Sequence, residues 1–271
     1  MRLFLVILTA AFAVWLPPAP DGETSPTAPP REAGVDQVVL PIDPGRYGEL
    51  QHARTPLPSR AIALTFDDGP DPTGNGRVLD ILDERGVKAT FFFVGQYARM
   101  HPEQVREVVR RGHNVASHSW SHPTRLRHWS RAAQIAEVRR SYAALEAALA
   151  DAPPEERARL EPMFRFPGLN EGAFLAGWLN QRGVIVVSAE GGADDWRGYS
   201  AARITRSVLS VAESNNGGVV ILHETRPQMI RALPGLLDEL SARGFTFVQI
   251  TAGEEGRARA LAADDPVLTL Q

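Results

Sequence analysis

The sequence of 271 residues contains no cysteine. This absence excludes a disulfide framework, a thiolate metal site, a catalytic cysteine and a lipoprotein anchor. Lys88 is the only lysine, and the formal net charge is −3. Because no cluster of basic side chains offers an electrostatic footprint for nucleic acid, nucleic acid is not expected as a partner. The hydrophobic fraction of 44% and the charged fraction of 23% exclude wholesale disorder.

No apolar run reaches the roughly 20 residues that a helix needs to span a bilayer. The most apolar segment is Leu3–Leu16, which follows a single positive charge at Arg2 and ends at Pro17. These features are typical of a secretory signal. Residues 1–16 are therefore predicted to be a signal peptide or a short uncleaved N-terminal anchor. The mature protein is expected to be exported from a bacterial cytoplasm, to the periplasm or the outside of the cell.

The distribution of proline predicts the domain organisation. Of the 21 prolines, 10 fall between Pro17 and Pro58, where periodic apolar residues are missing. Such a composition is typical of a linker. We therefore expect a proline-rich linker or pre-segment at 17–60, one folded domain at 61–250 and a polar C-terminal tail at 251–271.

Seven short apolar runs bounded by turn residues indicate buried parallel strands. They are Ala61–Phe66, Thr90–Val94, His113–Ser117, Met163–Phe166, Val184–Ser188, Gly218–Leu222 and Phe245–Ile250. The stretches between them have the apolar spacing of helices. These are Arg77–Leu82, His101–Arg111, Arg131–Ala150, Ala173–Gln181, Ala201–Glu213 and Pro227–Ala242. The alternation predicts an α/β fold with a parallel sheet, either a barrel or a doubly wound sheet.

Polar side chains gather where five of the predicted strands end. They are Asp67 and Asp68, His118 and His122, Arg165, Asp195, and His223. In both candidate folds the carboxyl ends of the strands line the active site. Each group alone could be a turn residue, an ion-pair partner or a buried histidine. Five such strand ends together indicate a catalytic site.

The types of these residues favour metal-assisted hydrolysis. His118 and His122 are four residues apart and can place two ring nitrogens on one metal ion. No glutamate stands between them, so a zincin-type protease motif is absent. A catalytic metal site usually has three protein ligands, and Asp68 would supply the third. Asp67 and His223 then remain as one base and one acid.

Five segments together resemble the motifs of a known family. They are Thr65–Pro70, His118–His122, Arg165–Gly168, Asp195–Trp196 and Ile221–His223. In this order they are similar to the five motifs of polysaccharide deacetylases, the NodB-homology family or carbohydrate esterase family 4. The resemblance covers about residues 61–250 and implies a distorted (β/α)7 TIM-like barrel. It also implies removal of N-acetyl, and sometimes O-acetyl, groups from extracellular glycans such as peptidoglycan, chitin oligomers, poly-N-acetylglucosamine or xylan.

The resemblance implies a role for each matched residue. Asp68, His118 and His122 would bind one divalent metal, most often Zn²⁺, with Co²⁺ or another divalent ion as alternatives. Asp67 would be the general base for the metal-activated water. Arg165 would hold Asp67 in place.

The remaining matched residues would complete the site. His223 would protonate the leaving sugar amine, and Asp195 would tune its charge. The backbone N–H of Gly168 would help the metal to bind the oxyanion. Trp196 and Ile221 would wall the pocket for the acetyl methyl group.

The sequence departs from the family pattern at three places. Pro167 is followed by Gly168 and Leu169, where family members often carry an aromatic residue that stacks on a sugar, so the sequence does not identify the glycan subsite. Glu190 stands where many members have aspartate, and its role is open. Ile221 replaces the usual leucine.

Two other functions remain open on the sequence alone. One is a hydrolase of the same fold that acts on a non-glycan amide or another C–N bond. The other is a catalytically inactive glycan-binding domain, against which the complete set of motif residues counts. The oligomeric state is also open. His52, His101, His113 and His128 lack motif partners and are expected at the surface or as capping groups.

Overall fold

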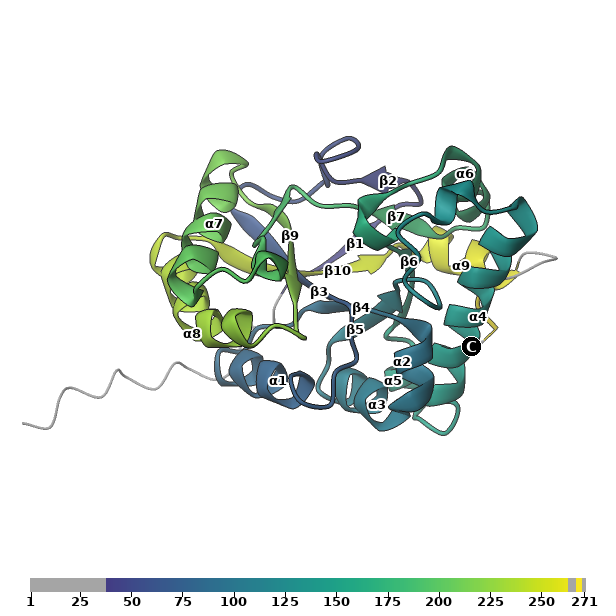
Figure 1. Ribbon diagram of the computed structural model, residues 1–271, viewed down its shortest axis with the longest axis horizontal. Helices are drawn as coiled ribbons and strands as arrows, with labels where there is room; N and C mark the ends of the chain where they lie inside the picture. The colour runs from purple at the N-terminus through teal and green to yellow at the C-terminus, as the bar shows by residue number, and fades with distance from the viewer. Residues whose placement is uncertain (1–37, 263–266, 270–271) are drawn as a thin grey trace, which may run out of the picture. The chain divides into compact units, whose positions relative to one another are not determined.

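The computed structural model describes residues 38–262 and 267–269 (Figure 1). Within them, one sheet contains ten strands, and every pair forms a parallel ladder. The strands are β1 (Val38–Ile42), β2 (Arg46–Tyr47), β3 (Ala61–Asp67), β4 (Thr90–Phe93), β5 (Asn114–Ser117), β6 (Leu160–Phe164), β7 (Ile185–Val187), β8 (Gly191–Gly192), β9 (Gly218–His223) and β10 (Thr246–Ala252). Their order is β1-β10-β3-β4-β5-β6-β7-β2, and β9 pairs with both β3 and β8.

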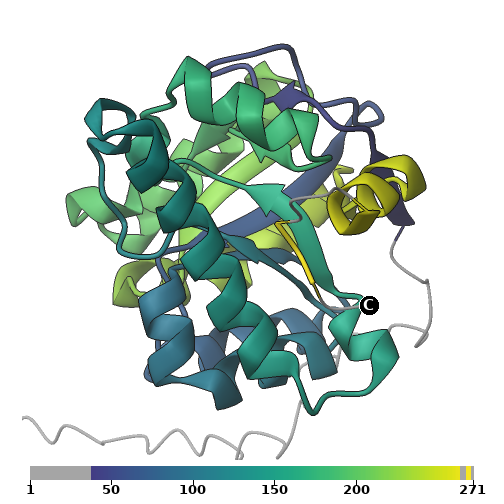
Figure 2. The same ribbon diagram turned by 90° about the vertical axis from the view of Figure 1, so that its right-hand side faces the viewer.

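Helices surround the strands, as Figures 1 and 2 show. The α-helices are α1 (Asn75–Glu84), α2 (Gly95–Met100), α3 (Pro102–Arg110), α4 (Arg131–Leu149), α5 (Pro154–Arg157), α6 (Ala173–Gln181), α7 (Ala201–Ser214), α8 (Pro227–Ala242) and α9 (Glu254–Ala262). Short 3-10 turns are η1 (Leu126–His128), η2 (Pro167–Leu169) and η3 (Asp195–Arg197). The seven predicted strands and six predicted helices are all present, which confirms the α/β class.

The sheet is rolled rather than flat. Strands β10 and β6 are separated by β3, β4 and β5 in the sheet order, yet they touch. Glu161 in β6 accepts hydrogen bonds from Thr251 Oγ1 at 2.6 Å and from Ala252 N at 2.8 Å in β10. Asn114 Nδ2 in β5 donates to the carbonyl of Ile250 at 3.0 Å. A sheet that meets itself in this way agrees with the predicted distorted barrel.

Alternation along the strands separates two apolar clusters. In β3 the side chains of Ile62, Leu64 and Phe66 belong to the larger cluster, which the helices cover. Ala61 and Ala63 point the other way, into a smaller cluster inside the rolled sheet. The inward face of β3 therefore continues toward its carboxyl end as a line of side chains that enters the interior of the barrel. Asp67, one of the predicted catalytic residues, stands at that end of β3.

The folded domain begins earlier than the boundary predicted at residue 61. Strand β1 pairs with β10 from Val38 to Ile42, and β2 pairs with β7. A proline-rich composition concealed both strands, because Pro41 lacks an N–H and is tolerated at a sheet edge only. The predicted signal or anchor at 1–16, and the linker up to residue 37, lie outside the described residues. Among the helices that are described, none is long and apolar enough to cross a membrane.

The described residues after 250 also belong to the fold, which corrects the polar tail predicted at 251–271. Strand β10 runs on to Ala252, and helix α9 follows it. Further along, Val267 and Leu268 are buried. Arg257 in α9 pairs with the buried carboxylate of Glu161 in β6, which ties this helix to the barrel. The charge-rich sequence of α9 gave no apolar stripe to signal it.

His113 was expected at the surface, and this expectation is wrong. The ring is fully buried and lies edge-on to Phe91 at 5.5 Å between centroids. Its Nδ1 accepts a hydrogen bond from Ala89 N at 3.1 Å. Burial, assisted by the charge of Lys88, lowers the pKa of His113 to about 3. The imidazole is therefore neutral in the folded protein at neutral pH.

A neutral buried histidine makes the fold sensitive to acid. Between pH 6.5 and about 3 the unfolded chain binds a proton at His113 that the folded chain excludes. The contribution of neutral His113 to the free energy of unfolding is therefore complete above pH 6.5. Below that value it falls by about 1.4 kcal/mol per pH unit. We expect His113→Gln to be less stable than wild type at pH 7 but to lose less stability between pH 6.5 and 4.5. Urea unfolding at several pH values measures both quantities.

The exposed His128 provides the matched control, since His128→Gln should leave the pH dependence of stability unchanged. A His113→Gln protein with the same loss of stability in acid as wild type would contradict the assignment.

Candidate active site

A pocket of about 550 Å³ opens at the carboxyl ends of the strands. Eight of the ten residues predicted for the site line it. They are Asp67, Asp68, His118, His122, Gly168, Trp196, Ile221 and His223. The other two, Arg165 and Asp195, are buried behind this lining and contact it through hydrogen bonds. The structure therefore brings all the predicted site residues to one place.

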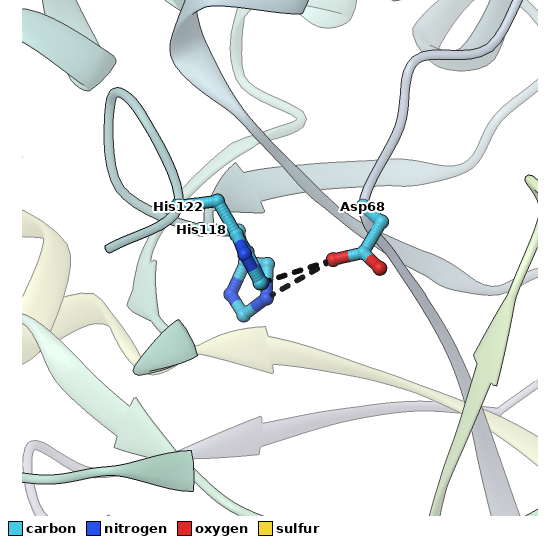
Figure 3. Close-up of side chains that lie close together, drawn as sticks. All are labelled: Asp68, His118 and His122. Atoms are coloured by element: carbon cyan, nitrogen blue, oxygen red, sulfur yellow. Dashed lines mark ion pairs between the residues drawn. The ribbon is translucent and has the colours of Figure 1, made fainter. Parts of the chain in front are cut away.

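Asp68, His118 and His122 converge on one point, as Figure 3 shows. One donor atom from each lies within 4.8 Å of the other two. Asp68 Oδ1 is 3.1 Å from His122 Nε2 and 3.6 Å from His118 Nε2. Asp68 and His122 have positive φ angles of 73° and 56°. Backbone strain of this kind is found where the surroundings fix a functional side chain.

The donor set fits a divalent metal. Asp68 Oδ1 is buried, and among the described residues it has no hydrogen-bond partner. Burial opposes ionisation of Asp68, but its close contact with His122 and the charges of nearby histidines hold its pKa below its ordinary value. Burial lowers the pKa of His118, which keeps its ring neutral. An ionised carboxylate and a neutral imidazole are the forms that bind metal ions.

A backbone contact orients the first of the two histidines. His118 Nδ1 lies 2.8 Å from the carbonyl oxygen of Arg165 and donates to it when the proton is on that nitrogen. The lone pair of Nε2 then faces Asp68. Histidines that bind metals are commonly held in this way by a hydrogen bond from their other nitrogen.

Asp67 at the end of β3 is paired with Arg165. Arg165 Nη1 donates to Asp67 Oδ1 at 2.6 Å and to Thr65 Oγ1 at 2.7 Å. Its Nε and Nη2 donate to the carbonyls of Val187 at 3.1 Å and Ser188 at 2.9 Å. Burial lowers the pKa of the Arg165 guanidinium, and the charge of Asp67 opposes that shift. The pair fixes Asp67 with one carboxylate oxygen bound and the other toward the pocket.

His223 at the end of β9 is paired with Asp195. His223 Nδ1 lies 2.6 Å from Asp195 Oδ1, and the backbone N–H of His223 donates to Asp195 Oδ2 at 2.8 Å. Burial alone would lower the pKa of His223, but the hydrogen bond and charge of Asp195 outweigh it and raise that pKa. The imidazole Nε2 lies 3.9 Å from Asp68 Oδ2. A protonated ring at this position faces the same pocket as Asp67.

The remaining predicted residues take up less uniform positions. Gly168 lines the pocket with a φ of 58°, and Ile221 lines it with 8% of its surface exposed. Trp196 also lines the pocket, but 53% of its surface is exposed, so it stands at the entrance. Leu50 and Leu169 line the same cavity. Leu50 was missed because it lies in the segment expected to be a linker.

Glu190, whose role the sequence left open, lies outside the pocket lining. Its carboxylate accepts the backbone N–H of Thr55 at 2.8 Å and that of Val219 at 2.5 Å. A Cβ atom on Gly218 would lie 2.6 Å from the Glu190 side chain. The contacts give Glu190 a structural position, in which it joins the N-terminal segment to the start of β9.

Glu224 is a buried carboxyl group that the sequence analysis did not single out. Its Oε1 accepts the backbone N–H of Asp71 at 3.0 Å. It packs so closely that a Cβ atom on Gly69 would lie 2.0 Å from Oε1. Burial raises the pKa of Glu224 to about 8. The neutral side chain supports the turn that follows Asp68, and only its place directly after His223 could have pointed to it.

Comparison with known proteins matches the chain to polysaccharide deacetylases. The sequence profile described as polysaccharide deacetylase matches residues 54–170. A chitooligosaccharide deacetylase of Bradyrhizobium sp. is 33% identical over 202 residues, which cover 69% of this chain and 87% of that protein. A peptidoglycan-N-acetylglucosamine deacetylase of Listeria monocytogenes is 29% identical over 202 residues, and the match covers 74% of this chain. The chain spans 40% of the length of that relative.

A solved structure is similar to this chain in both fold and sequence. The peptidoglycan deacetylase of Bdellovibrio bacteriovorus is 27% identical and aligns with a TM-score of 0.70. The alignment covers 80% of this chain and 59% of that one. The Bradyrhizobium relative is 33% identical and is covered over 87% of its length, which establishes the family. The chain belongs to the polysaccharide deacetylase family.

Proposed function

We propose that the protein is a metal-dependent hydrolase that removes N-acetyl groups from an N-acetylated glycan. The observation that carries the proposal is a single pocket in which three metal-ligand side chains meet a carboxylate–arginine pair and a histidine–aspartate pair. A peptidoglycan or a chitin-type oligosaccharide is the proposed substrate, because relatives of both names match the chain.

Asp68, His118 and His122 would hold the metal, and Zn²⁺ suits one carboxylate and two imidazoles. When bound, such an ion polarises a carbonyl group and lowers the pKa of water. The chain offers carboxylate and imidazole donors only, since it has no cysteine.

Asp67 is proposed as the general base. Arg165 engages Oδ1, and the other carboxylate oxygen is free to accept a proton from the attacking water. The pair is buried, so the geometry of the carboxylate is fixed before substrate arrives. A positioned base that does not need to reorganise lowers the barrier to proton transfer.

His223 is proposed as the general acid. An amine leaves an acetamide poorly unless its nitrogen is protonated. The Asp195 carboxylate holds the proton on Nδ1, which orients Nε2 into the pocket, and it favours the charged imidazolium. The N–H of Gly168 is proposed to donate to the developing oxyanion, and Ile221 and Trp196 are proposed to contact the acetyl methyl group.

Export from the cytoplasm is part of the proposal. It rests on Arg2 and on the apolar segment Leu3–Leu16, and it would bring the enzyme to cell-wall or extracellular glycans. The acetylated glycan is the proposed partner. The alternative of an inactive glycan-binding domain loses support because the complete set of acid, base and ligand side chains converges on one pocket.

The first test is acetate release from a panel of acetylated glycans with and without a chelator. We expect release from N-acetylated oligomers, loss of release after EDTA treatment and its return on addition of Zn²⁺. Elemental analysis confirms that the metal has been removed. Undiminished release by protein shown to be metal-free would contradict the metal requirement, and no release from any glycan by metal-loaded protein would contradict the function.

Two substitutions distinguish the role of the base from the role of the metal ligands. Asp67→Asn should retain the metal but lose acetate release by about 10²- to 10⁴-fold, because the amide cannot accept the proton. His118→Ala should lose the metal itself, because only two protein donors remain. Metal content after dialysis and turnover are measured on the same preparations. An Asp67→Asn enzyme with most of its activity would show that the base is another group.

The acid is tested through its partner. Asp195→Asn removes the charge that favours the protonated ring, so we expect kcat to fall by about ten- to a hundredfold with little change in metal content. Asp238→Asn is the matched control, because this exposed aspartate lies on α8 and pairs with Arg85. If Asp195→Asn kept wild-type kcat, as the control Asp238→Asn is expected to do, Asp195 would not support proton donation by His223. The assignment of the acid would then be wrong.

A further inference from the structure

A segment that precedes the region of the family match forms part of the pocket. Residues 46–53 follow β1 and include β2, whose Arg46 and Tyr47 pair with Val186 and Val187 of β7. The profile match begins only at residue 54. Leu50 nevertheless lines the same cavity as Asp67 and His223. We call residues 46–53 the N-terminal wall.

Backbone contacts hold the N-terminal wall in a tight turn. Gly48 N and His52 N donate to Ala53 O and Gly48 O, at 2.9 and 2.8 Å. Leu50 N donates to the carbonyl of Ala189 at 3.0 Å. Gly48 has a φ of 109°, and a Cβ atom there would lie 2.3 Å from Ala189 N, so only glycine allows this approach. The backbone of Leu50 is therefore fixed against the end of β7.

Side chains join the N-terminal wall to η2 and to the loop that follows it. Gln51 Nε2 donates to the carbonyl of Leu169. His52 Nε2 lies 2.6 Å from one carboxylate oxygen of Glu171, and Arg46 Nη1 lies 2.7 Å from the other. Leu169 has a φ of 54°, a conformation that a leucine adopts only when its neighbours hold it. These contacts fix two leucines, Leu50 and Leu169, in the lining of one cavity.

Leu50 presents exposed apolar surface to the pocket. Its side chain is 53% exposed although its backbone is anchored. An exposed apolar side chain that lines a concave site gains free energy when a ligand covers it. The pyranose rings of β-linked glycans present C–H groups on their faces, which are apolar surfaces of this kind. The sugar-stacking aromatic ring expected after Pro167 is absent here, and this chain has Gly168 and Leu169 at that place.

We propose that the N-terminal wall is a glycan subsite in which Leu50, beside Leu169, covers the face of the sugar ring next to the residue that is deacetylated. This inference rests on the proposed function and makes it more specific. The substrate is then a glycan chain of two or more sugars, and a free monosaccharide leaves the subsite empty. Leu50 acts on substrate binding and takes no part in proton transfer.

The test compares substrates of different length. Acetate release is measured with N-acetylglucosamine and with its β-1,4-linked tetramer. Leu50→Ala should raise KM for the tetramer by about five- to tenfold with little change in kcat, because the alanine side chain covers less of the apolar face of the sugar. Its kcat/KM for the monosaccharide should equal that of wild type. Leu50→Phe should restore the low KM, since a larger apolar surface covers the same ring.

Met100→Ala is the control for loss of an exposed apolar side chain elsewhere, because Met100 on α2 is 62% exposed and does not line the pocket. It should behave as wild type with both substrates. An equal effect of Leu50→Ala on monosaccharide and tetramer, or no effect on either, would overturn the subsite.

A binding experiment separates failure of the subsite from failure of the proposed function. In the Asp67→Asn background, calorimetric titration with the tetramer requires no turnover. Tighter binding with Leu50 than with Ala at position 50 supports the subsite even if no preparation released acetate. Equal affinities of the two proteins for the tetramer would overturn it, whatever the activity.

Discussion

The arrangement of the pocket depends on one buried arginine. Arg165 is fully shielded from solvent, and a lone guanidinium in such a place would be very unfavourable. Its charge is met by Asp67, and its other donors reach Thr65 and the carbonyls of Val187 and Ser188. Because Arg165 itself follows β6 and its partners stand at the ends of β3 and β7, satisfying its donors sets the ends of the three strands at matching heights. Asp67, the proposed base, is placed by the same requirement that stabilises the interior.

Much of the fold and nearly all of the site followed from local sequence. Buried parallel strands are continuous apolar runs, and β3, buried along its whole length, is such a run. The site residues were found because ionisable groups directly after these runs have no structural reason to cluster. The resemblance to the family then implied a role for each of these residues. The helix α6, Ala173–Gln181, has the bounds that its pattern predicted.

The features that were missed depend on contacts between distant residues. Strand β1 has Val38 exposed and contains Pro41, so neither burial nor periodicity marks it, and only its pairing with β10 makes it a strand. His113 has the same local appearance as a surface histidine, and its burial follows from the packing of β4 against β5. The part that Leu50 takes in the pocket is visible only once β2 pairs with β7, about 140 positions further along the chain.

The two proposed proton-transfer groups occupy the same level of adjacent strands. Asp67 of β3 stands opposite His223 of β9 in the parallel ladder, and Thr65 Oγ1 donates to the carbonyl of Val220 within the same pair. The spacing between the proposed base and acid is thus a property of strand pairing, whereas the proposed glycan subsite lies on the N-terminal wall and the loop after Gly168. Insertions or substitutions in residues 46–53 or after Gly168 can change which polymer enters while the distance across which protons move stays constant. Under the proposed function, substrate range and chemical competence are therefore separable and can vary independently.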